Sequence, residues 1–261
     1  MSTAIPSFPH SAITRDGRGV YTLRITDAKS INVLGSAVIQ GLIQAVDWIA
    51  AQADARVVVL RGTGDKAFVG GADIHEMAGL APPGARAFIT NLRVLCEAVR
   101  NIPVPTVARI PGYCLGGGLE LAAVCDVRIA SDQARFGMPE VRVGIPSVIH
   151  ACLLPALIGR GAANWLLLSG ESVDAEQALR WGFVQFVTTA DKLDQLMEQT
   201  VAAIVSGAPQ AVRSQKALLR FWEGSTVNAG LDRSVAAFGA AYETEEPRQY
   251  MAPFLKRKKA D

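Results

Sequence analysis

Two kinds of hydrophobic spacing alternate along the first two-thirds of this chain. Apolar residues at helical spacing predict an amphipathic helix over residues 36–52 and a second helix that ends near Asn101. Strands are expected where apolar residues alternate or run together, at residues 21–25, 57–60, 106–110 and 127–130. Strand and helix therefore alternate, which is typical of an α/β core built from stacked strand–helix units.

After about residue 151 the pattern becomes mainly helical. Helices are expected at residues 153–158, 162–168, 175–181, 192–206, 211–222 and 228–242. Composition changes sharply nowhere, so we expect one α/β unit with a helical C-terminal extension. We place the core at residues 1–200 and the helical region, expected to serve oligomerisation, at residues 201–261.

Composition and charge narrow the class of protein. Half of the 261 residues are hydrophobic, enough for a large core in one domain. The 26 basic and 24 acidic residues nearly balance, which argues against a nucleic-acid partner bound through phosphate contacts. The four cysteines lie in apolar stretches without a Cys-x-x-Cys pair. They are predicted to be buried free thiols of a reducing compartment: Cys96, Cys114, Cys125 and Cys152.

Targeting and membrane signals are weak in this sequence. The first residues lack the apolar core of a signal peptide, and no apolar run, that at residues 165–168 included, is long enough to span a bilayer. We therefore expect a soluble cytoplasmic protein that has no membrane partner.

The most informative local feature is the glycine triplet Gly116 to Gly118, which precedes an apolar run. Consecutive glycines lose much conformational entropy on folding, and they suit a helix start where bare backbone N–H groups approach a ligand. Glu120 follows at once, and Glu140 comes after Pro139. Backbone donors for an oxyanion together with two carboxylates for proton transfer indicate an enzyme that forms an enolate.

Other uses of these glycines fit less well. A dinucleotide-binding fingerprint would need a glycine where Leu121 stands, and a phosphate-binding loop would need a lysine and a hydroxyl that are missing. Without a Gly-x-Ser-x-Gly segment, a serine hydrolase lacks its nucleophile. The alternatives that remain are glycines for close packing, Glu120 as an ordinary first-turn acid and Glu140 as a solvated loop acid. The apolar neighbours of Glu120 favour a functional carboxylate.

Longer motifs around the triplet resemble the crotonase superfamily, and within it most closely the enoyl-CoA hydratases. The motifs are FVGGADI at residues 68–74, VARIPGYCLGGGLE at residues 107–120 and FGMPE at residues 136–140. The likeness runs from about Tyr21 to the C-terminus. It implies an α/β crotonase-like spiral of repeated strand-strand-helix units with a helical C-terminal region.

The resemblance also implies roles for individual residues. It assigns an oxyanion hole to the N–H groups of Ala72 and Gly117, and it assigns the two catalytic glutamates to Glu120 and Glu140. Members of the family that only isomerise, dehalogenate or decarboxylate generally lack one of these acids. The implied reaction is therefore reversible hydration of a trans-2-enoyl-CoA.

A set of CoA-binding residues follows from the same resemblance. The segment around Lys29 and Ile31 is similar to one near the CoA nucleotide, or it is simply a turn into the next helix. Phe238 and Arg257 align with residues that reach the CoA of a neighbouring subunit, although Phe238 could equally be helix core and the basic tail a solvated run. The full expected set is Lys29, Ile31, Ala72, Asp73, Ile74, Phe238 and Arg257. Asp73 is also expected to shape its turn through its side chain.

The resemblance implies no metal and no cofactor, since CoA is part of the substrate, and neither His10 nor His75 has partners for a metal site. It also implies a homotrimer or a homohexamer. An excess of apolar side chains in the C-terminal helices points to subunit contacts as well: Leu218, Leu219, Phe221, Trp222, Val235, Phe238 and Tyr242.

One segment departs from the family. After the second glutamate the hydratases usually carry glycines, whereas this chain has GIPSVIH at residues 144–150, one residue shorter. In the family this segment shapes the acyl pocket and helps to place the attacking water. The change is therefore expected to alter the acyl specificity and, to a lesser degree, the reaction itself. His150 could line the altered pocket, but packing or capping of the next helix is favoured. The alternatives are a double-bond isomerase, a hydratase for aryl or branched acyl groups, and a non-catalytic acyl-CoA binding protein.

Overall fold

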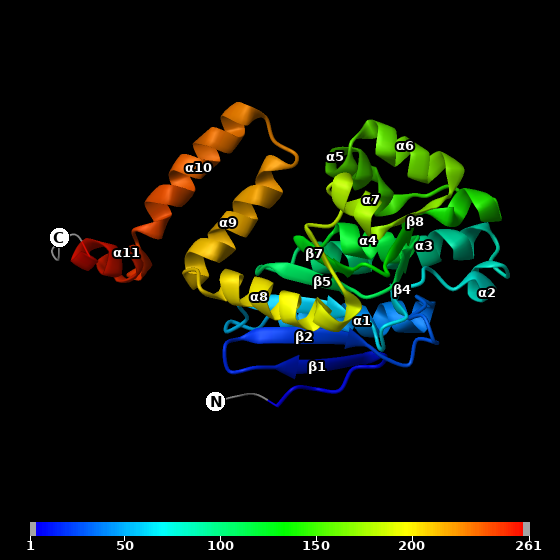
Figure 1. Cartoon of the computed structure of the whole chain (residues 1–261), viewed down its shortest axis with the longest axis horizontal. Coiled ribbons are helices and arrows are strands. Elements are labelled where there is room, and N and C mark those ends of the chain that lie inside the picture. The colour runs from blue at the N-terminus through cyan, green and yellow to red at the C-terminus, as the bar shows by residue number, and fades with distance from the viewer. Residues whose placement is uncertain (1–3, 258–261) are drawn as a thin grey trace.

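The structure, a computed structural model, describes residues 4–257 and the side chains of residues 4–255 (Figure 1). Its strands are β1 (Ser11–Arg15), β2 (Val20–Ile25), β3 (Val57–Arg61), β4 (Ala67–Val69), β5 (Thr106–Ile110), β6 (Tyr113–Leu115), β7 (Val127–Ser131), β8 (Arg135–Gly137), β9 (Ser172–Asp174) and β10 (Phe186–Thr188). Its α-helices are α1 (Ser36–Ala50), α2 (Ile74–Met77), α3 (Pro82–Arg100), α4 (Gly117–Ala123), α5 (Leu154–Ile158), α6 (Arg160–Ser169), α7 (Ala175–Arg180), α8 (Leu193–Val205), α9 (Pro209–Trp222), α10 (Val227–Ala241) and α11 (Glu246–Arg257). Three 3-10 helices complete the described elements: η1 (Pro139–Val143), η2 (Ile149–Leu153) and η3 (Ala190–Lys192).

The strands form two sheets that the chain visits in turn. The larger sheet has the order β1-β2-β3-β5-β7-β10, and its strands are parallel except for β1, which pairs antiparallel with β2. The smaller sheet has the order β4-β6-β8-β9, with β9 antiparallel to β8. Because β3, β5 and β7 are each followed by a strand of the smaller sheet, the chain climbs as a spiral of strand-strand-helix units. The expected fold class is confirmed.

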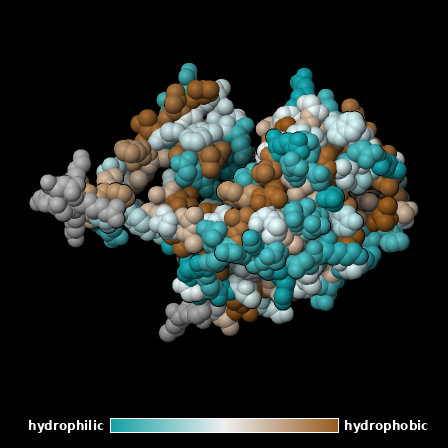
Figure 2. Space-filling model, in the orientation of Figure 1, coloured by the Kyte–Doolittle hydropathy of each residue, from teal (hydrophilic) through white to brown (hydrophobic). Residues whose placement is uncertain are grey.

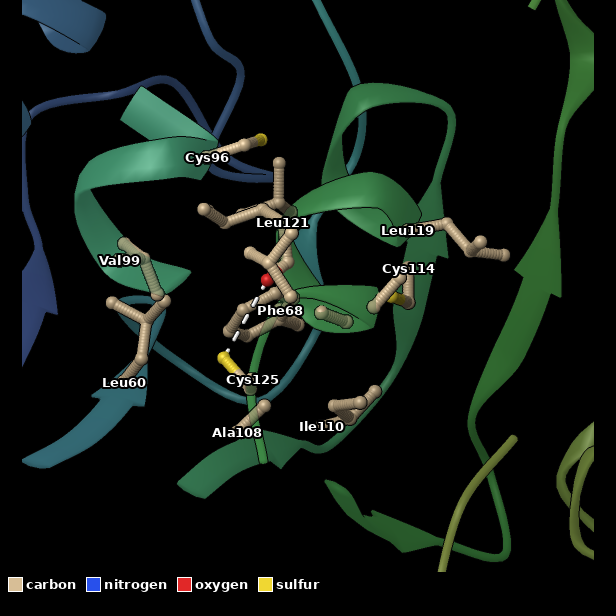
Figure 3. Packing of buried hydrophobic residues seen from close by; sticks show 14 of the residues in the cluster. Leu60, Phe68, Cys96, Val99, Ala108, Ile110, Cys114, Leu119, Leu121 and Cys125 are labelled. Carbon is tan, nitrogen blue, oxygen red and sulfur yellow. Dashed lines mark hydrogen bonds between the residues drawn. The ribbon is translucent and has the colours of Figure 1, made fainter. Parts of the chain in front are cut away.

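The core lies between the sheets and the helices α1, α3 and α4. Leu60 of β3, Val99 of α3 and Cys125 after α4 belong to one buried cluster, part of which Figure 3 shows. The Cys125 thiol donates to the carbonyl oxygen of Leu121 across 3.5 Å, so even this buried polar group has a partner. The other face of the larger sheet packs against α8 through a second apolar cluster, which contains Val201. Glycine-led α4 is thereby fixed deep inside the molecule.

Helices α9, α10 and α11 form an arm that extends away from this body (Figure 1). A buried lysine of α9 attaches the arm: Lys216 Nζ donates to the carbonyl oxygen of Val104 at 2.8 Å and lies 2.8 Å from Asp126 Oδ2. Figure 2 shows apolar surface exposed along the arm.

The longer helices and strands lie where they were predicted from the sequence. The predicted helix over residues 36–52 is α1, and the predicted strand over residues 106–110 is β5. The three-residue strands of the smaller sheet, with β9 and β10 inside the supposedly helical last third, were not predicted. The prediction that all four cysteines are buried was wrong for Cys152, which is exposed on η2 because its neighbours on that short turn face inward. Within residues 4–257, no helix combines the length and apolar character needed to cross a membrane.

Candidate active site

The glycine triplet makes contacts that a side chain would block. Gly116 has φ 52° and ψ −125°, a positive-φ conformation that favours glycine, and an added Cβ would lie 2.5 Å from Glu140 Oε1. A Cβ on Gly118 would lie 2.4 Å from the carbonyl oxygen of Val69 in β4. Bare backbone therefore lets α4 begin directly beside a carboxylate and a strand of the smaller sheet.

Two backbone N–H groups meet at this helix start. Gly117 is the first residue of α4, where an amide N–H has no partner within the helix, and Ala72 forms an isolated bridge with Leu34. A Cβ on Gly117 would lie 3.9 Å from the nitrogen of Ala72, so the two amides are close neighbours. Neither N–H donates to an acceptor in the part of the chain that the structure describes. Both residues line one cavity, where their N–H groups can serve a ligand oxygen.

Glu120 occupies the first turn of α4 and is almost fully buried. Its Oε1 accepts a hydrogen bond from the backbone N–H of Ala151 at 2.9 Å. Burial raises the pKa of this carboxyl to about 8, the negative charge of Glu140 adds to the rise, and the N–H groups of Ala151 and His150 oppose it. The prediction that Glu120 is buried is confirmed.

A strained residue directs the amides that meet Glu120. Ile149 has φ 41°, a left-handed conformation that is rare for a β-branched side chain. It opens η2, whose next two residues present their N–H groups to Glu120. Ile149 stands in the segment where the family usually has glycines. Its positive φ is a backbone conformation that glycine adopts easily, so this chain has such a conformation there with an isoleucine in place of a glycine.

Glu140 lies in η1, at the edge of the same cavity. Its carboxylate is half-buried: Oε1 faces Gly116, and Oε2 accepts a hydrogen bond from Ser147 Oγ at 2.8 Å. His150 is a buried residue of η2 and does not line the cavity. Burial lowers the pKa of its imidazole, and the charge of Arg100 adds to that effect. The favoured interpretation of His150 as a packing residue agrees with this position.

The cavity brings most of the predicted site together. It has a volume of about 730 Å³ and is lined by eight of the ten residues predicted for the catalytic, oxyanion and CoA-binding roles: Lys29, Ile31, Ala72, Asp73, Ile74, Gly117, Glu120 and Glu140. Lys29 Nζ lies 2.6 Å from Asp73 Oδ2, and this hydrogen bond lowers the pKa of the Asp73 carboxyl. Asp73 also caps α2 by accepting from the N–H of His75, so its predicted structural role is confirmed.

The other two predicted residues have different outcomes. Phe238 is exposed on α10 and lines a separate hollow of the arm, so the interpretation as helix core was wrong for the single chain. The side chain of Arg257 lies outside the described residues.

The apolar wall of the cavity and two polar contacts were not predicted from the sequence. The wall comes from α2, α3 and the turn between them, and its residues are Met77, Leu80, Phe88, Ile89 and Leu92. The helical spacing of Phe88 and Leu92 was visible, but spacing cannot distinguish a stripe that faces core from one that faces a cavity. The hydrogen bonds that Ser147 and the N–H of Ala151 donate to the two glutamates are tertiary contacts, and no sequence pattern indicates them.

Comparisons with known proteins agree along nearly the whole chain. A family model described as enoyl-CoA hydratase/isomerase matches residues 15–261. The short-chain-enoyl-CoA hydratase of Clostridium acetobutylicum is 32% identical over 250 residues, 95% of each chain. The crotonyl-CoA hydratase of Syntrophomonas wolfei subsp. wolfei is 32% identical over 240 residues, 92% of each chain.

Solved structures show the same similarity in three dimensions. The enoyl-CoA hydratase of Bacillus anthracis superposes with a TM-score of 0.91 at 30% identity, covering 95% of this chain and 96% of the other. DspI of Pseudomonas aeruginosa gives a TM-score of 0.92 at 28% identity, covering 98% of both chains. The family match spans the spiral, the glycine-led helix and both glutamates. The chain belongs to the enoyl-CoA hydratase/isomerase family of the crotonase superfamily.

Proposed function

We propose that this protein hydrates trans-2-enoyl-CoA thioesters by adding water reversibly across the C2=C3 double bond. The observation that carries the proposal is the meeting of four groups at one cavity: the N–H groups of Ala72 and Gly117 and the carboxyl groups of Glu120 and Glu140. The hydratase names of the similar proteins support the same reaction.

In the proposed mechanism, the thioester oxygen lies between the N–H groups of Ala72 and Gly117. These donors bind the oxygen more strongly as C2 becomes enolate-like, which lowers the barrier rather than merely tightening binding. Glu120, in its ionised form, takes a proton from the water whose oxygen bonds to C3. Glu140 gives a proton to C2, and before the next turnover a proton passes through solvent from Glu120 back to Glu140, so the elements of one water are added for each double bond lost. The proposed reaction needs no cofactor, since CoA arrives as part of the substrate.

The cavity suggests how the substrate is held. Its apolar wall from α2 and α3 suits an acyl chain, whereas the ion pair of Lys29 and Asp73 lies on the lining and suits the polar CoA. The experiment that tests the proposal is an assay of enoyl-CoA thioesters from crotonyl to long-chain and aryl, which follows loss of the conjugated double bond. Conversion of 3-enoyl-CoA with no hydration would show an isomerase. CoA binding with no turnover of any thioester would show a non-catalytic binding protein.

We further propose that the arm assembles a homotrimer or a dimer of trimers. Support comes from the exposed apolar side chains of α10, among them Val235 and Phe238. In this proposal Phe238 and Arg257 complete the CoA nucleotide site of a neighbouring subunit. Removing the residues after Pro247 should then raise KM for acyl-CoA more than for a short pantetheine thioester, which lacks the nucleotide. Equal effects on both would show that the tail serves folding alone.

A further inference from the structure

Ser147 makes a hydrogen bond to Glu140, and this hydrogen bond has no role in the mechanism proposed above. Its hydroxyl donates to Glu140 Oε2 at 2.8 Å, and the serine is half-buried behind the cavity wall. Ile145, Pro146 and Val148 line the cavity on either side of it, while Ser147 itself does not. The serine therefore reaches the site through Glu140.

The two glutamates are held in different ways. Glu120 is enclosed by apolar packing and accepts from the backbone at the start of η2. Glu140 lies half-exposed in η1. Among the described residues, its carboxylate accepts one side-chain hydrogen bond, from Ser147. A glutamate has three side-chain torsions, so without this bond the carboxylate can leave its position against Gly116.

The contact also distinguishes the two carboxylate oxygens. Oε2 takes the serine hydroxyl, and Oε1 lies where a Cβ on Gly116 would approach it to 2.5 Å, beside the proposed oxyanion hole. A hydroxyl can donate to Oε2 whether or not Oε1 carries a proton. Oε1 is thus the oxygen left free to exchange a proton with the substrate.

We propose that Ser147 is a positioning residue for Glu140: it fixes Oε2 and so keeps Oε1 directed at C2 of the acyl group. This inference rests on the proposed function, in which Glu140 gives a proton to C2. It assigns to the segment GIPSVIH one specific task, performed by a side chain at the point where the family's usual glycines are missing.

The test separates positioning from folding by using two variants and one control. Ser147→Ala removes the hydroxyl, and Ser147→Thr keeps a hydroxyl at the same carbon. Ser234→Ala is the matched control, because the Ser234 hydroxyl also makes one hydrogen bond, to the carbonyl oxygen of Gly230 at 2.7 Å, on the distant α10. Each protein is assayed for kcat and KM with crotonyl-CoA and for melting temperature.

A second readout isolates Glu140. Exchange of the C2 protons of butyryl-CoA in D₂O, followed by NMR, needs a base at C2 and the oxyanion hole, but no attack of water on C3. Ser147→Ala should slow both exchange and kcat roughly ten-fold, the usual effect of one hydrogen bond to a charged group, with KM changed by less than about two-fold. Ser147→Thr should recover most of both rates, and Ser234→Ala should match the wild type.

Unchanged exchange and kcat in Ser147→Ala would overturn the inference while leaving the hydratase proposal intact. So would a loss of rate that parallels a lower melting temperature and that threonine does not restore. If the wild type hydrates no enoyl-CoA but exchanges the C2 protons in a manner that depends on Ser147, the proposed function fails and the positioning role stands. A wild type that neither hydrates nor exchanges overturns both.

Discussion

The backbone N–H of Ala151 lies 2.9 Å from Oε1 of Glu120, and the chain reaches that amide through the left-handed Ile149. A buried carboxylate is thus met by amide dipoles rather than by a cation. Dipoles compensate burial only in part, so the pKa of Glu120 rises to about 8, mainly through desolvation. The proposed site therefore contains a carboxyl that is ready to hold or release a proton near neutral pH.

This pKa predicts how stability depends on pH. In the unfolded chain Glu120 ionises near 4.5, whereas in the folded chain it stays protonated up to about 8. Between these values the unfolded state binds fewer protons, so the contribution of Glu120 to stability is complete below about 4.5 and falls as pH rises, by roughly 1.4 kcal/mol per pH unit. Urea unfolding of the wild type and of Glu120→Gln at pH 5.5, 6.5 and 7.5 measures the difference, since glutamine has no such slope. Parallel pH dependences would contradict the assigned pKa.

The same pKa predicts the pH dependence of activity. Glu120 must be ionised and Glu140 protonated, so the active form carries one proton on the pair, and kcat/KM for crotonyl-CoA should fall as pH rises through about 8, where that proton is lost. In Glu140→Gln only Glu120 titrates, so the activity that remains should instead rise with pH, with a midpoint below about 8 because the charge of Glu140 no longer contributes. A wild-type profile that stays flat from pH 6 to 9 would show that the two glutamates do not share a proton in this way.

The sequence predicted this site in part, for physical reasons that differ between residues. Glycines and acids near α4 were visible because only glycine suits the conformation at Gly116 and because an acid amid apolar neighbours is unusual. The helix α1 was predicted from its periodic apolar face, which is buried, and β5 from a short, mainly apolar run whose five residues are all buried. The strands of the smaller sheet were not predicted, because three residues are too few to show an alternating hydrophobic pattern. The Ser147 contact is tertiary and has no local pattern.

Both glutamates should be needed for turnover. Glu120→Gln and Glu140→Gln each keep the shape of the side chain but remove its ability to exchange a proton. Each should lower kcat with crotonyl-CoA by a factor of roughly 10² to 10⁴, the usual contribution of a positioned acid or base. Binding of a saturated acyl-CoA, measured by calorimetry, should barely change. Near-full activity in either variant would remove that residue from the mechanism.

The oxyanion hole can be tested at Gly117 with two matched substitutions. Gly117→Pro removes the N–H, and proline is tolerated at the first position of a helix. Gly117→Ala keeps the N–H while adding a Cβ, which would lie 2.9 Å from Leu92 Cδ2 at the end of a flexible side chain. Loss of one oxyanion donor should reduce kcat by roughly 10² to 10³ in the proline variant, and the alanine variant should retain much more. Circular dichroism checks that both fold. Equal rates in the two folded variants would contradict the assigned donor.

The arm predicts the state of assembly. One face of α10 carries a stripe of apolar residues at helical spacing that are 58% to 79% exposed in the single chain: Val227, Leu231, Val235, Phe238 and Tyr242. An exposed apolar stripe of this length normally packs against a partner, so light scattering should show a trimer or a hexamer. The double variant Val235→Asp and Phe238→Asp should shift the protein toward monomers without loss of helix content, because neither side chain supports the fold of its own subunit. Leu168→Asp is the control, since Leu168 is 78% exposed on α6, outside the stripe, and should leave assembly unchanged. A wild-type monomer, or a double variant that assembles normally, would assign the stripe to some other partner.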